Sequence, residues 1–323
     1  MKGNVLNTKS KRYIRVFHLF IISLIFVAIA ASIAVVCFNY IGNRNFRESF
    51  FSVSSLKVNN KIRIVQISDL HNCSYGKDNS KMIDRVKKLQ PDLIIYTGDI
   101  IDSKAATNDN VVNLCKALAK VAPSYYIYGN NEVEKYYKMP LSQDALDNKL
   151  GFNDKNRDPE KFLALTDALT KKLEAAGVKV LKNSMDSITI GTTNIDVYGV
   201  LTSNPSAFWS YGGERFDEYL YTNENNLKIT AIHEPQVFEE FTPHTWGDVL
   251  LAGHNHGGTF KIPMIGPLYT HDGGFLPARG GHLVAGRYDV AGSPLVISSG
   301  LDNKNIFRIN NQPEVVIVDI NKF

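Results

Sequence analysis

The sequence predicts an α/β protein, a four-layer α/β sandwich in which two packed mixed sheets are flanked by helices, with a transmembrane helix at its N-terminus. Three observations support this fold class. Short apolar runs alternate with helical patterns from Lys61 onward, strands outnumber helices late in the chain, and residues 16–43 contain no charged side chain. Alternating strands and helices favour a parallel sheet, and the later excess of strands favours a second sheet packed on the first.

The apolar run from Val16 to Phe38 is longer than the roughly 20 residues that span a bilayer. A cleaved signal peptide is the alternative, but its apolar region is normally only about 7–15 residues long. We therefore interpret residues 16–41 as a transmembrane anchor and residues 1–15 as a basic cytoplasmic leader. Five basic residues precede the span, and only Arg44 and Arg47 closely follow it. This bias predicts that the protein is a single-pass protein of the cell membrane, with the large domain extracytoplasmic.

The remaining composition is that of a globular protein. The chain has 323 residues, of which 44% are apolar and 21% are charged, which is enough for a sizeable core. The net charge of +4 owes much to the basic leader, and no basic stripe is interleaved with aromatic residues, so we expect no nucleic-acid partner. Outside the span there are only Cys73 and Cys115, a scarcity compatible with an exported protein. A disulfide between them is open but not favoured.

The predicted elements follow one another from residue 61 to residue 323, after a polar segment at 42–60 that we interpret as a stalk. In chain order they are a strand at 61–68, a helix at 80–89, a strand at 92–99, a helix at 110–121, a strand at 124–130, a helix and a strand within 160–181, a hairpin at 187–200, and strands at 227–233, 247–254, 294–300 and 314–320. Residues 134–158 are polar and lack periodicity, so we expect an insertion there.

Polar side chains that can bind metals follow five of these strands, at the carboxyl ends where ligands gather in α/β sheets. They are Asp69 and His71, Asp99 with Asp102, Asn130, His233, and His254 with His256. Each is weak evidence alone, because a strand-end Asp often caps a helix, an Asn after Gly usually turns the chain, and a lone His is more often a core residue. Their joint arrival at one sheet edge predicts a metal site.

Carboxylate, amide and imidazole ligands together suit a pair of borderline divalent ions such as Mn²⁺, Fe²⁺ or Zn²⁺, and the absence of thiolates argues against a structural zinc site. Two such ions, about 3.5–4 Å apart, can hold a hydroxide for in-line attack on phosphorus and screen the developing negative charge. The residue types therefore predict a hydrolase of phosphate esters.

The ordered motifs resemble the calcineurin-like metallophosphoesterases from about Lys61 to the C-terminus. They are Asp69-x-His71, Gly98-Asp99-x-x-Asp102, Gly129-Asn130, His233 and Gly253-His254-x-His256. The segments 253–269 and 298–320 are similar to the membrane-associated bacterial branch of that family.

The resemblance implies a set of roles for the matching residues. Asp69, His71 and His256 would hold one metal, Asn130, His233 and His254 the other, and Asp99 would bridge them. The glycines at 98, 129 and 253 are expected to let the backbone turn sharply below the ions. Asp102 is expected to cap or support rather than to ligate.

Asn131 departs from the family pattern, which has a histidine at that position, and it is expected in a catalytic role together with Asp99. An amide donates a hydrogen bond but cannot deliver a proton, so general-acid catalysis worth roughly 10²–10⁴ would be lost unless another group supplies it. His271 and His282, in a glycine-rich segment, are candidates, although each is more simply a surface loop residue.

These observations predict a membrane-anchored, dinuclear metal-dependent phosphohydrolase. Its substrate is expected to contain a phosphodiester or pyrophosphate bond in a membrane lipid or lipid-linked molecule, with residues 260–269 offering apolar contact; a buried loop is the alternative interpretation of that segment. The alternative function is a metal-binding receptor or scaffold with feeble activity, suggested by Asn131. Retention of all seven expected ligand positions favours the enzyme. A nucleic-acid phosphodiesterase is weakened by the expected location and the missing basic stripe.

Overall fold

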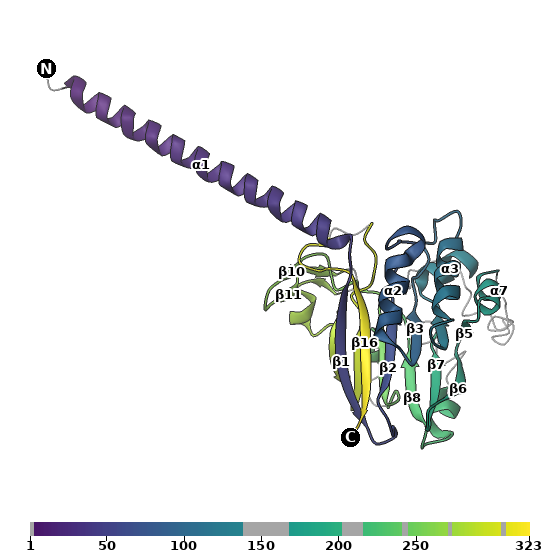
Figure 1. The fold of residues 1–323 in the computed structure, drawn as a ribbon. Coiled ribbons are helices and arrows are strands. Elements are labelled where there is room, and N and C mark those ends of the chain that lie inside the picture. Colours follow the sequence, from purple (N-terminus) through teal and green to yellow (C-terminus); the bar gives the residue numbers. More distant parts are fainter. Residues whose placement is uncertain (1–2, 138–167, 202–215, 241–244, 271–272, 305–307) are drawn as a thin grey trace, which may run out of the picture.

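The computed structural model describes residues 3–137, 168–201, 216–240, 245–270, 273–304 and 308–323 (Figure 1). Two six-stranded sheets pack face to face, with helices on their outer faces. The predicted α/β sandwich is confirmed. The apolar layer between the sheets contains fully buried side chains from both, including Ile64 and Ile95 of the first sheet and Ile229 and Leu251 of the second.

The first sheet has the strand order β1-β16-β2-β3-β4-β5. Its strands are β1 (Arg47–Ser55), β2 (Ile62–Ile67), β3 (Leu93–Thr97), β4 (Ser124–Ile127), β5 (Lys179–Leu181) and β16 (Glu314–Lys322). Strands β2 to β5 run parallel, and the chain returns between them through α2 (Ser80–Leu89), α3 (Asp109–Leu118) and α7 (Ala168–Ala175). Helix α2 buries Met82, Val86 and Leu89 along one face, which is the helical spacing that the sequence shows.

The second sheet has the strand order β14-β15-β9-β8-β7-β6. Its strands are β6 (Ser184–Ile190), β7 (Thr193–Gly199), β8 (Leu227–Ala231), β9 (Val249–Ala252), β14 (Gly286–Val290) and β15 (Ser293–Ile297). The predicted hairpin is the antiparallel pair β6–β7, whereas β7, β8, β9 and β15 pair in parallel. The outer face of this sheet is covered by three buried aromatic side chains. They are Phe216, Trp246 and Phe238, the last of which lies in the short helix α9 (Val237–Glu240).

Several short elements were not predicted from the sequence. Strands β10 (Lys261–Ile262) and β11 (Gly266–Pro267) form one small hairpin, and β12 (Tyr269–Thr270) and β13 (Gly274–Phe275) form another. Helix α4 (Asn130–Tyr137) starts within the expected third strand and occupies the beginning of the expected insertion at 134–158. The rest of that insertion, and residues 160–167 of the helix expected after it, lie outside the described residues.

The segment at 42–60, expected as a stalk, contains strand β1 and belongs to the sandwich. β1 pairs in parallel with β16 along all nine of its residues. Phe46 and Val53 are 3% and 4% exposed. The Arg47 guanidinium donates from Nε and Nη2 to Glu314 Oε2, at 3.0 and 2.7 Å. The sequence of β1 is polar because the strand lies at the edge of the sheet. Its partner strand is more than 250 residues away in the chain, so the pairing leaves no local signal.

We expect a fragment that begins at Lys61 to be markedly less stable than one that begins at Arg44. The shorter fragment loses the burial of Phe46 and Val53, worth about 1.5–3 kcal/mol each, and leaves the buried Glu314 carboxylate without Arg47. Thermal unfolding followed by circular dichroism should show a midpoint lower by roughly 10 °C or more. Equal midpoints would show that β1 contributes nothing to the sandwich.

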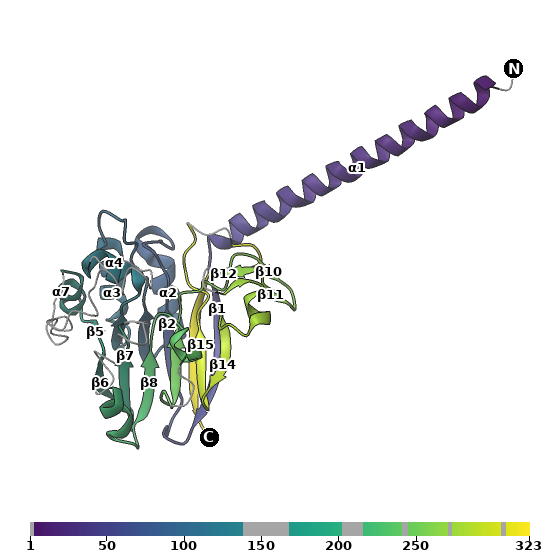
Figure 2. The same ribbon diagram turned by 180° about the vertical axis from the view of Figure 1, so that it is seen from behind.

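Helix α1 (Gly3–Asn43) projects away from the sandwich, as Figures 1 and 2 show. Within the described part of the chain, its residues 11–43 are long and apolar enough to cross a membrane, with a mean hydropathy of 3.0 in the most apolar stretch. That stretch is not buried against the rest of the protein. By length and composition, it is either a membrane span or a signal sequence.

Candidate metal centre

The predicted site residues lie together, but at the ends of two sheets rather than at the edge of one. Asp69 follows β2 and Asp99 follows β3 in the first sheet, and Asn130 begins α4 just after β4. His233 follows β8 and His254 follows β9 in the second sheet. The two sheets pack with these carboxyl ends adjacent. Sequence patterns reveal which strands carry polar ends, but they do not show which sheet each strand joins.

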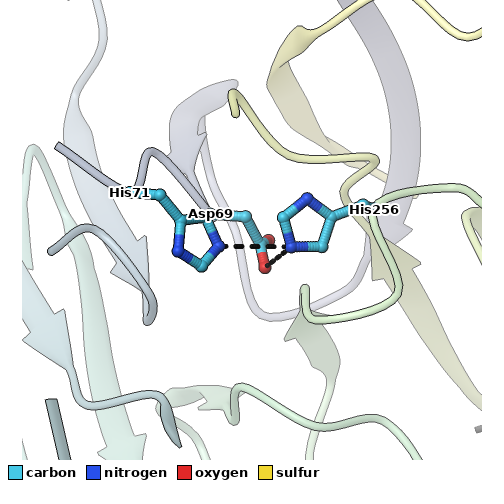
Figure 3. A group of neighbouring side chains, drawn as sticks. All are labelled: Asp69, His71 and His256. Atoms are coloured by element: carbon cyan, nitrogen blue, oxygen red, sulfur yellow. Dashed lines mark hydrogen bonds and ion pairs between the residues drawn. The ribbon is translucent and has the colours of Figure 1, made fainter. Parts of the chain in front are cut away.

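One group consists of Asp69, His71 and His256 (Figure 3), whose ligand atoms all lie within 4.8 Å of one another. The Nε2 atoms of His71 and His256 are 3.2 Å apart, and their rings stack with centroids 5.0 Å apart. Asp69 Oδ1 lies 3.4 Å from His256 Nε2. One carboxylate oxygen and two imidazole nitrogens thus face a common point.

A second group joins Asp69 to Asp99 and His233, again with ligand atoms within 4.8 Å of one another. His233 Nε2 lies 3.4 Å from Asp99 Oδ2 and 3.9 Å from Asp69 Oδ1. The Nδ1 atom of His254 lies 3.3 Å from the same His233 nitrogen. Asp99 Oδ2 also lies 3.7 Å from His71 Nε2, so this carboxylate faces both groups.

The donor atoms of these groups suit divalent cations. His233 Nδ1 is 2.7 Å from the carbonyl oxygen of Thr97, and because a carbonyl only accepts, Nδ1 carries the hydrogen. Nε2 is therefore the nitrogen that faces the carboxylates, where it binds either a second proton or a metal, and this is the orientation that metal-binding histidines take. Asn130 Oδ1 is buried, lies on a residue that lines the same pocket, and has no hydrogen-bond partner within the described ranges. Buried acceptors are normally satisfied by a hydrogen-bond donor, an ordered water or an ion, and a divalent cation would satisfy this one.

The electrostatics of the centre favour added positive charge. Burial raises the pKa of Asp69. Burial would also raise the pKa of Asp99, but the charges of His233 and His71 and a hydrogen bond from Asn131 hold it well below its ordinary value. Burial would lower the pKa of His233, yet Asp99 and Asp69 raise it far above its usual range. A cation between these carboxylates is stabilised by the same field that stabilises the proton on His233.

Five of the expected ligand residues have backbone angles in the left-handed region, where residues other than glycine are uncommon. The φ values are 51° at Asp69, 47° at His71, 53° at Asp99, 74° at His254 and 48° at His256. Conformations of this kind cost free energy and concentrate at functional sites. The sharp turns at this centre are therefore made largely by the polar residues themselves.

The three glycines expected to turn the backbone have different roles. Gly98 has a φ of 83°, as expected. Gly129 and Gly253 are instead needed for close approach: a Cβ at Gly129 would lie 2.4 Å from Asp99 Oδ1, and one at Gly253 would lie 2.0 Å from Ser68 Oγ. Side chains at either position would displace the neighbouring carboxylate loops.

Glu132 is a residue of the centre to which sequence reasoning assigned no role. Its side chain is fully buried. It accepts hydrogen bonds from the backbone N–H groups of Asp99, Ile100, Ile101 and Gly129 and from the hydroxyl of Tyr126. The carboxylate therefore ties the loop after β3 to the loop after β4, which holds Asp99 close to Asn130. The sequence offered one signal for this role, namely that Glu132 is an acidic residue directly after the two asparagines.

Arg308 is a second residue that the sequence did not indicate. It is 1% exposed, donates from Nη2 to the carbonyl of Ser299 at 2.7 Å, and places the same nitrogen 3.3 Å from His256 Nδ1. The guanidinium thus lies against the ring edge of His256 that faces away from Asp69. Its position 52 residues after His256, in a loop without periodicity, carries no local pattern.

Asn131 lies at the centre, but both the oxygen and the nitrogen of its side-chain amide already form hydrogen bonds within the protein. Its backbone N–H and Nδ2 donate to the two oxygens of Asp99 at 2.8 and 2.7 Å, and its Oδ1 accepts from the N–H of Ser103 at 3.0 Å. The side chain of Asn131 therefore positions Asp99.

The sequence singled out three other polar residues, Asp102, His271 and His282. Asp102 accepts from the N–H of Lys104 within a turn, consistent with a supporting role. His282 is exposed on a loop, and His271 lies outside the described residues.

A pocket of about 320 Å³ opens over the centre. Its lining residues are His71, Asp99, Asn130, Asn131, His254, Asn255, His256, Gly258, Thr259, Tyr269 and Thr270. Of the last three, Thr259 precedes the first small hairpin, and Tyr269 and Thr270 form β12 of the second. Cys73 and Cys115 are buried free thiols. They do not form the disulfide that the sequence leaves open.

The fold and the clustered Asp, His and Asn side chains define a class of metal-dependent hydrolases. The chain belongs to the calcineurin-like phosphoesterase family, whose model matches residues 62–258, and it is accordingly a metal-dependent phosphoesterase. It is 27% identical to the metallophosphoesterase YkuE of Bacillus subtilis over 264 residues, which cover 79% of this chain and 77% of YkuE.

Two further relatives carry more specific names. The phosphodiesterase YaeI of Escherichia coli is 23% identical over 72% of this chain and 71% of its own length. The UDP-2,3-diacylglucosamine pyrophosphatase LpxG of Chlamydia muridarum is 26% identical over 62% of this chain and 65% of its own length.

Proposed function

We propose that the protein is a membrane-anchored phosphohydrolase with a dinuclear metal centre, which cleaves a phosphodiester or pyrophosphate bond in a lipid-linked substrate. The observation that carries the proposal is that two acid–histidine groups share the Asp69 carboxylate and that Asp99 of the second group also faces His71 of the first, with the buried Asn130 Oδ1 at the same pocket. A single metal would need only one such group. Two adjoining groups fit two ions.

The proposed ligands divide between the two ions. Asp69, His71 and His256 would hold one, Asn130, His233 and His254 would hold the other, and Asp99 would serve both. When bound, a pair of divalent ions supplies an activated nucleophile at neutral pH and stabilises the negative charge that develops on phosphorus.

The protein's own side chains keep this arrangement rigid. Asn131 donates to Asp99, Glu132 accepts from the backbone around Asp99, and Thr97 fixes the ring of His233. Arg308 lies against the far edge of the His256 ring. Each contact holds a metal ligand in place before substrate arrives, and this preorganisation is the larger part of what a protein contributes at such a centre.

The substrate class is proposed from the pocket and the relatives together. A pocket of about 320 Å³ accommodates a phosphoryl group and the first atoms of each substituent, while the rest of a larger molecule extends outward. A phosphodiesterase and a pyrophosphatase of a diacylated sugar nucleotide are among the relatives. Hydrolysis of a phosphodiester and hydrolysis of a pyrophosphate both replace one oxygen substituent on phosphorus with the oxygen of water. A single centre of this kind can therefore support either reaction.

The membrane anchor and its orientation are proposed from α1 and the charges beside it. The basic residues of the leader precede the span, so the sandwich is placed outside the cytoplasmic membrane. A reporter fused after Phe323 should then behave as extracytoplasmic, and a reporter active only in the cytoplasm would contradict this orientation.

A metal-binding receptor or scaffold is the second candidate function, and the contacts of Asn131 favour it. The family histidine is missing, and the amide that replaces it is bound to Asp99 and Ser103. A domain that keeps its metals but lacks a proton donor can bind phosphate esters without turning them over quickly. The two functions differ in turnover, not in metal content.

We expect the full-length protein to hydrolyse bis(4-nitrophenyl) phosphate and a diphosphate-linked ester in the presence of Mn²⁺, Fe²⁺ or Zn²⁺. Chelation should abolish turnover, and one of these ions should restore it. His256→Ala should lose activity by about 10²-fold or more. The matched control is His282→Ala, which removes an exposed imidazole outside the pocket and should leave turnover unchanged. Metal binding without hydrolysis of any ester would support the scaffold instead.

A further inference from the structure

The two small hairpins carry a group of exposed apolar side chains, hereafter the hairpin surface. Its members and their exposed fractions are Phe260 at 38%, Met264 at 106%, Ile265 at 40%, Tyr269 at 45% and Phe275 at 71%. Met264 and Ile265 lie in the turn between β10 and β11, and Tyr269 pairs with Phe275 across β12 and β13. The alternative interpretation of residues 260–269 as a buried loop is therefore wrong. Scattered exposed apolar residues are ordinary, but a group on consecutive hairpins indicates an interaction site.

The hairpin surface is tied to the end of α1. Asn310 donates from its backbone to Asn39 Oδ1 at 2.8 Å and from its side chain to the carbonyl of Lys261 at 3.0 Å. Asn43 Nδ2 donates to the carbonyl of Arg308 at 3.1 Å. Both views show β10 and β11 beside the C-terminal end of α1 (Figures 1 and 2). The hairpins thus have a fixed place next to the last turns of that helix.

Those last turns mark the level of a membrane surface if α1 spans the bilayer. Asn39 is the first polar residue after the apolar run that ends at Phe38. Tyr40 is 61% exposed, and the guanidinium of Arg44 lies 4.6 Å from the centre of its ring. Tyrosine side chains are enriched at this depth, and an arginine near a helix end extends its charged group to the interface. A hairpin anchored at Asn39 therefore lies at the boundary between headgroups and acyl chains.

The hairpin surface is also continuous with the pocket over the metal centre. Thr259, Tyr269 and Thr270 line that pocket together with His71 and Asp99. Tyr269 therefore belongs both to the exposed apolar surface and to the wall of the site. A molecule whose acyl chains stay in the bilayer can reach the centre only with its headgroup, and this wall lies on the side where the headgroup would enter.

We propose that the hairpin surface inserts into the outer face of a phospholipid bilayer and presents the phosphoester headgroup of a bilayer-held substrate to the metal centre. The occupant of the surface is the lipid bilayer. The substrate part rests on the proposed function. The insertion rests on the exposed apolar area and on the attachment to α1, and it shares with the proposed function only the membrane span of that helix. Insertion of this kind needs no further protein, because apolar side chains at an interface gain from leaving water.

A fluorescent probe tests the insertion without reference to activity. Met264→Cys and the matched control Met185→Cys are made in a Cys37→Ala background, since Cys73 and Cys115 are fully buried. Met185 is 36% exposed on β6, the edge strand at the opposite side of the second sheet from β14. The full chain is labelled, reconstituted into phospholipid vesicles, and compared in ordinary and brominated lipid.

The probe at position 264 should lose about half or more of its fluorescence in brominated lipid, and the probe at position 185 should not change. Equal behaviour of the two probes would overturn the proposal. A probe at 264 that is shielded from aqueous quenchers but insensitive to brominated lipid would also overturn it, because the surface would then be covered by protein.

An activity comparison tests the substrate part. Met264→Glu should reduce hydrolysis of a vesicle-embedded lipid diphosphate by about tenfold and leave hydrolysis of soluble bis(4-nitrophenyl) phosphate unchanged. Met185→Glu should change neither rate. Unchanged rates with Met264→Glu on both substrates would contradict headgroup presentation. If the unmodified protein cleaves neither substrate, the proposed function fails, and the probe experiment still decides the insertion.

Discussion

Replacing Asp99 with asparagine is expected to lower hydrolysis of every phosphate ester by on the order of 10³-fold or more. Asp99 Oδ2 lies 3.4 Å from His233 Nε2 and 3.7 Å from His71 Nε2, so it faces both proposed ligand groups. Asparagine preserves the shape but removes the negative charge, and its amide nitrogen would oppose the donating Nδ2 of Asn131. The measurement is kcat with saturating metal and a soluble phosphodiester.

Asp102→Asn is the matched control for this change. Asp102 is a carboxylate on the same loop, three residues later, but it accepts from the N–H of Lys104 in a turn and does not line the pocket. Its substitution should leave kcat within about threefold of the unmodified protein, because the side-chain hydrogen bond of Asp102 within the described residues is to the Lys104 N–H and not to a proposed ligand. An Asp99→Asn protein that turns over normally, with its fold confirmed by circular dichroism, would remove Asp99 from the centre.

Asn131→His is expected to change which leaving groups the enzyme can expel. The unmodified protein should cleave aryl diesters and pyrophosphates much faster than alkyl esters, because an alkoxide needs a proton as it departs and Asn131 cannot deliver one. An imidazole at position 131 would line the pocket beside the proposed metals and could donate that proton. Alkyl-ester turnover should then rise by up to about 10²-fold relative to aryl-ester turnover.

The readout is the ratio of the alkyl rate to the aryl rate, which cancels differences in active fraction. Asn255→His is the matched control, since Asn255 also lines the pocket but donates its amide to the carbonyl of Leu283 rather than to Asp99. It should leave the ratio unchanged. Equal alkyl and aryl rates before and after Asn131→His would show that another group supplies the proton, and a loss with His271→Ala would identify His271 as that group.

The parts of the fold that the sequence predicted well are those whose signal is local. Strands β2 and β3 and the helix between them each show a short, regular sequence pattern. A polar residue that is unsuited to an apolar layer follows each strand. The proximity of Asp69 and Asp99 followed from that rule, because the carboxyl ends of neighbouring parallel strands meet, whereas His233 joins them from the second sheet. Ser80–Leu89 was predicted to the residue because one helical face alone is apolar.

The parts that the sequence did not predict depend on distant or very short contacts. β1 is rich in serine and charged residues and carries an exposed Phe50, so it lacks a clean alternating pattern, and its strand structure depends on pairing with β16. Each strand of the two hairpins is two residues long, too short for periodicity to appear. Glu132 and Arg308 act on ligands from other loops, so their contacts with Asp99 and His256 emerge only when the chain is folded.

The most direct test of the central claim is the metal content of the purified full-length protein. Elemental analysis after dialysis should find two divalent ions per chain, because Asp69 and Asp99 face two adjoining sets of ligand atoms. The Asp99→Asn protein should retain fewer than two, and the Asp102→Asn protein should retain both. A single ion, or none, in the unmodified protein under conditions in which it hydrolyses esters would contradict the dinuclear centre.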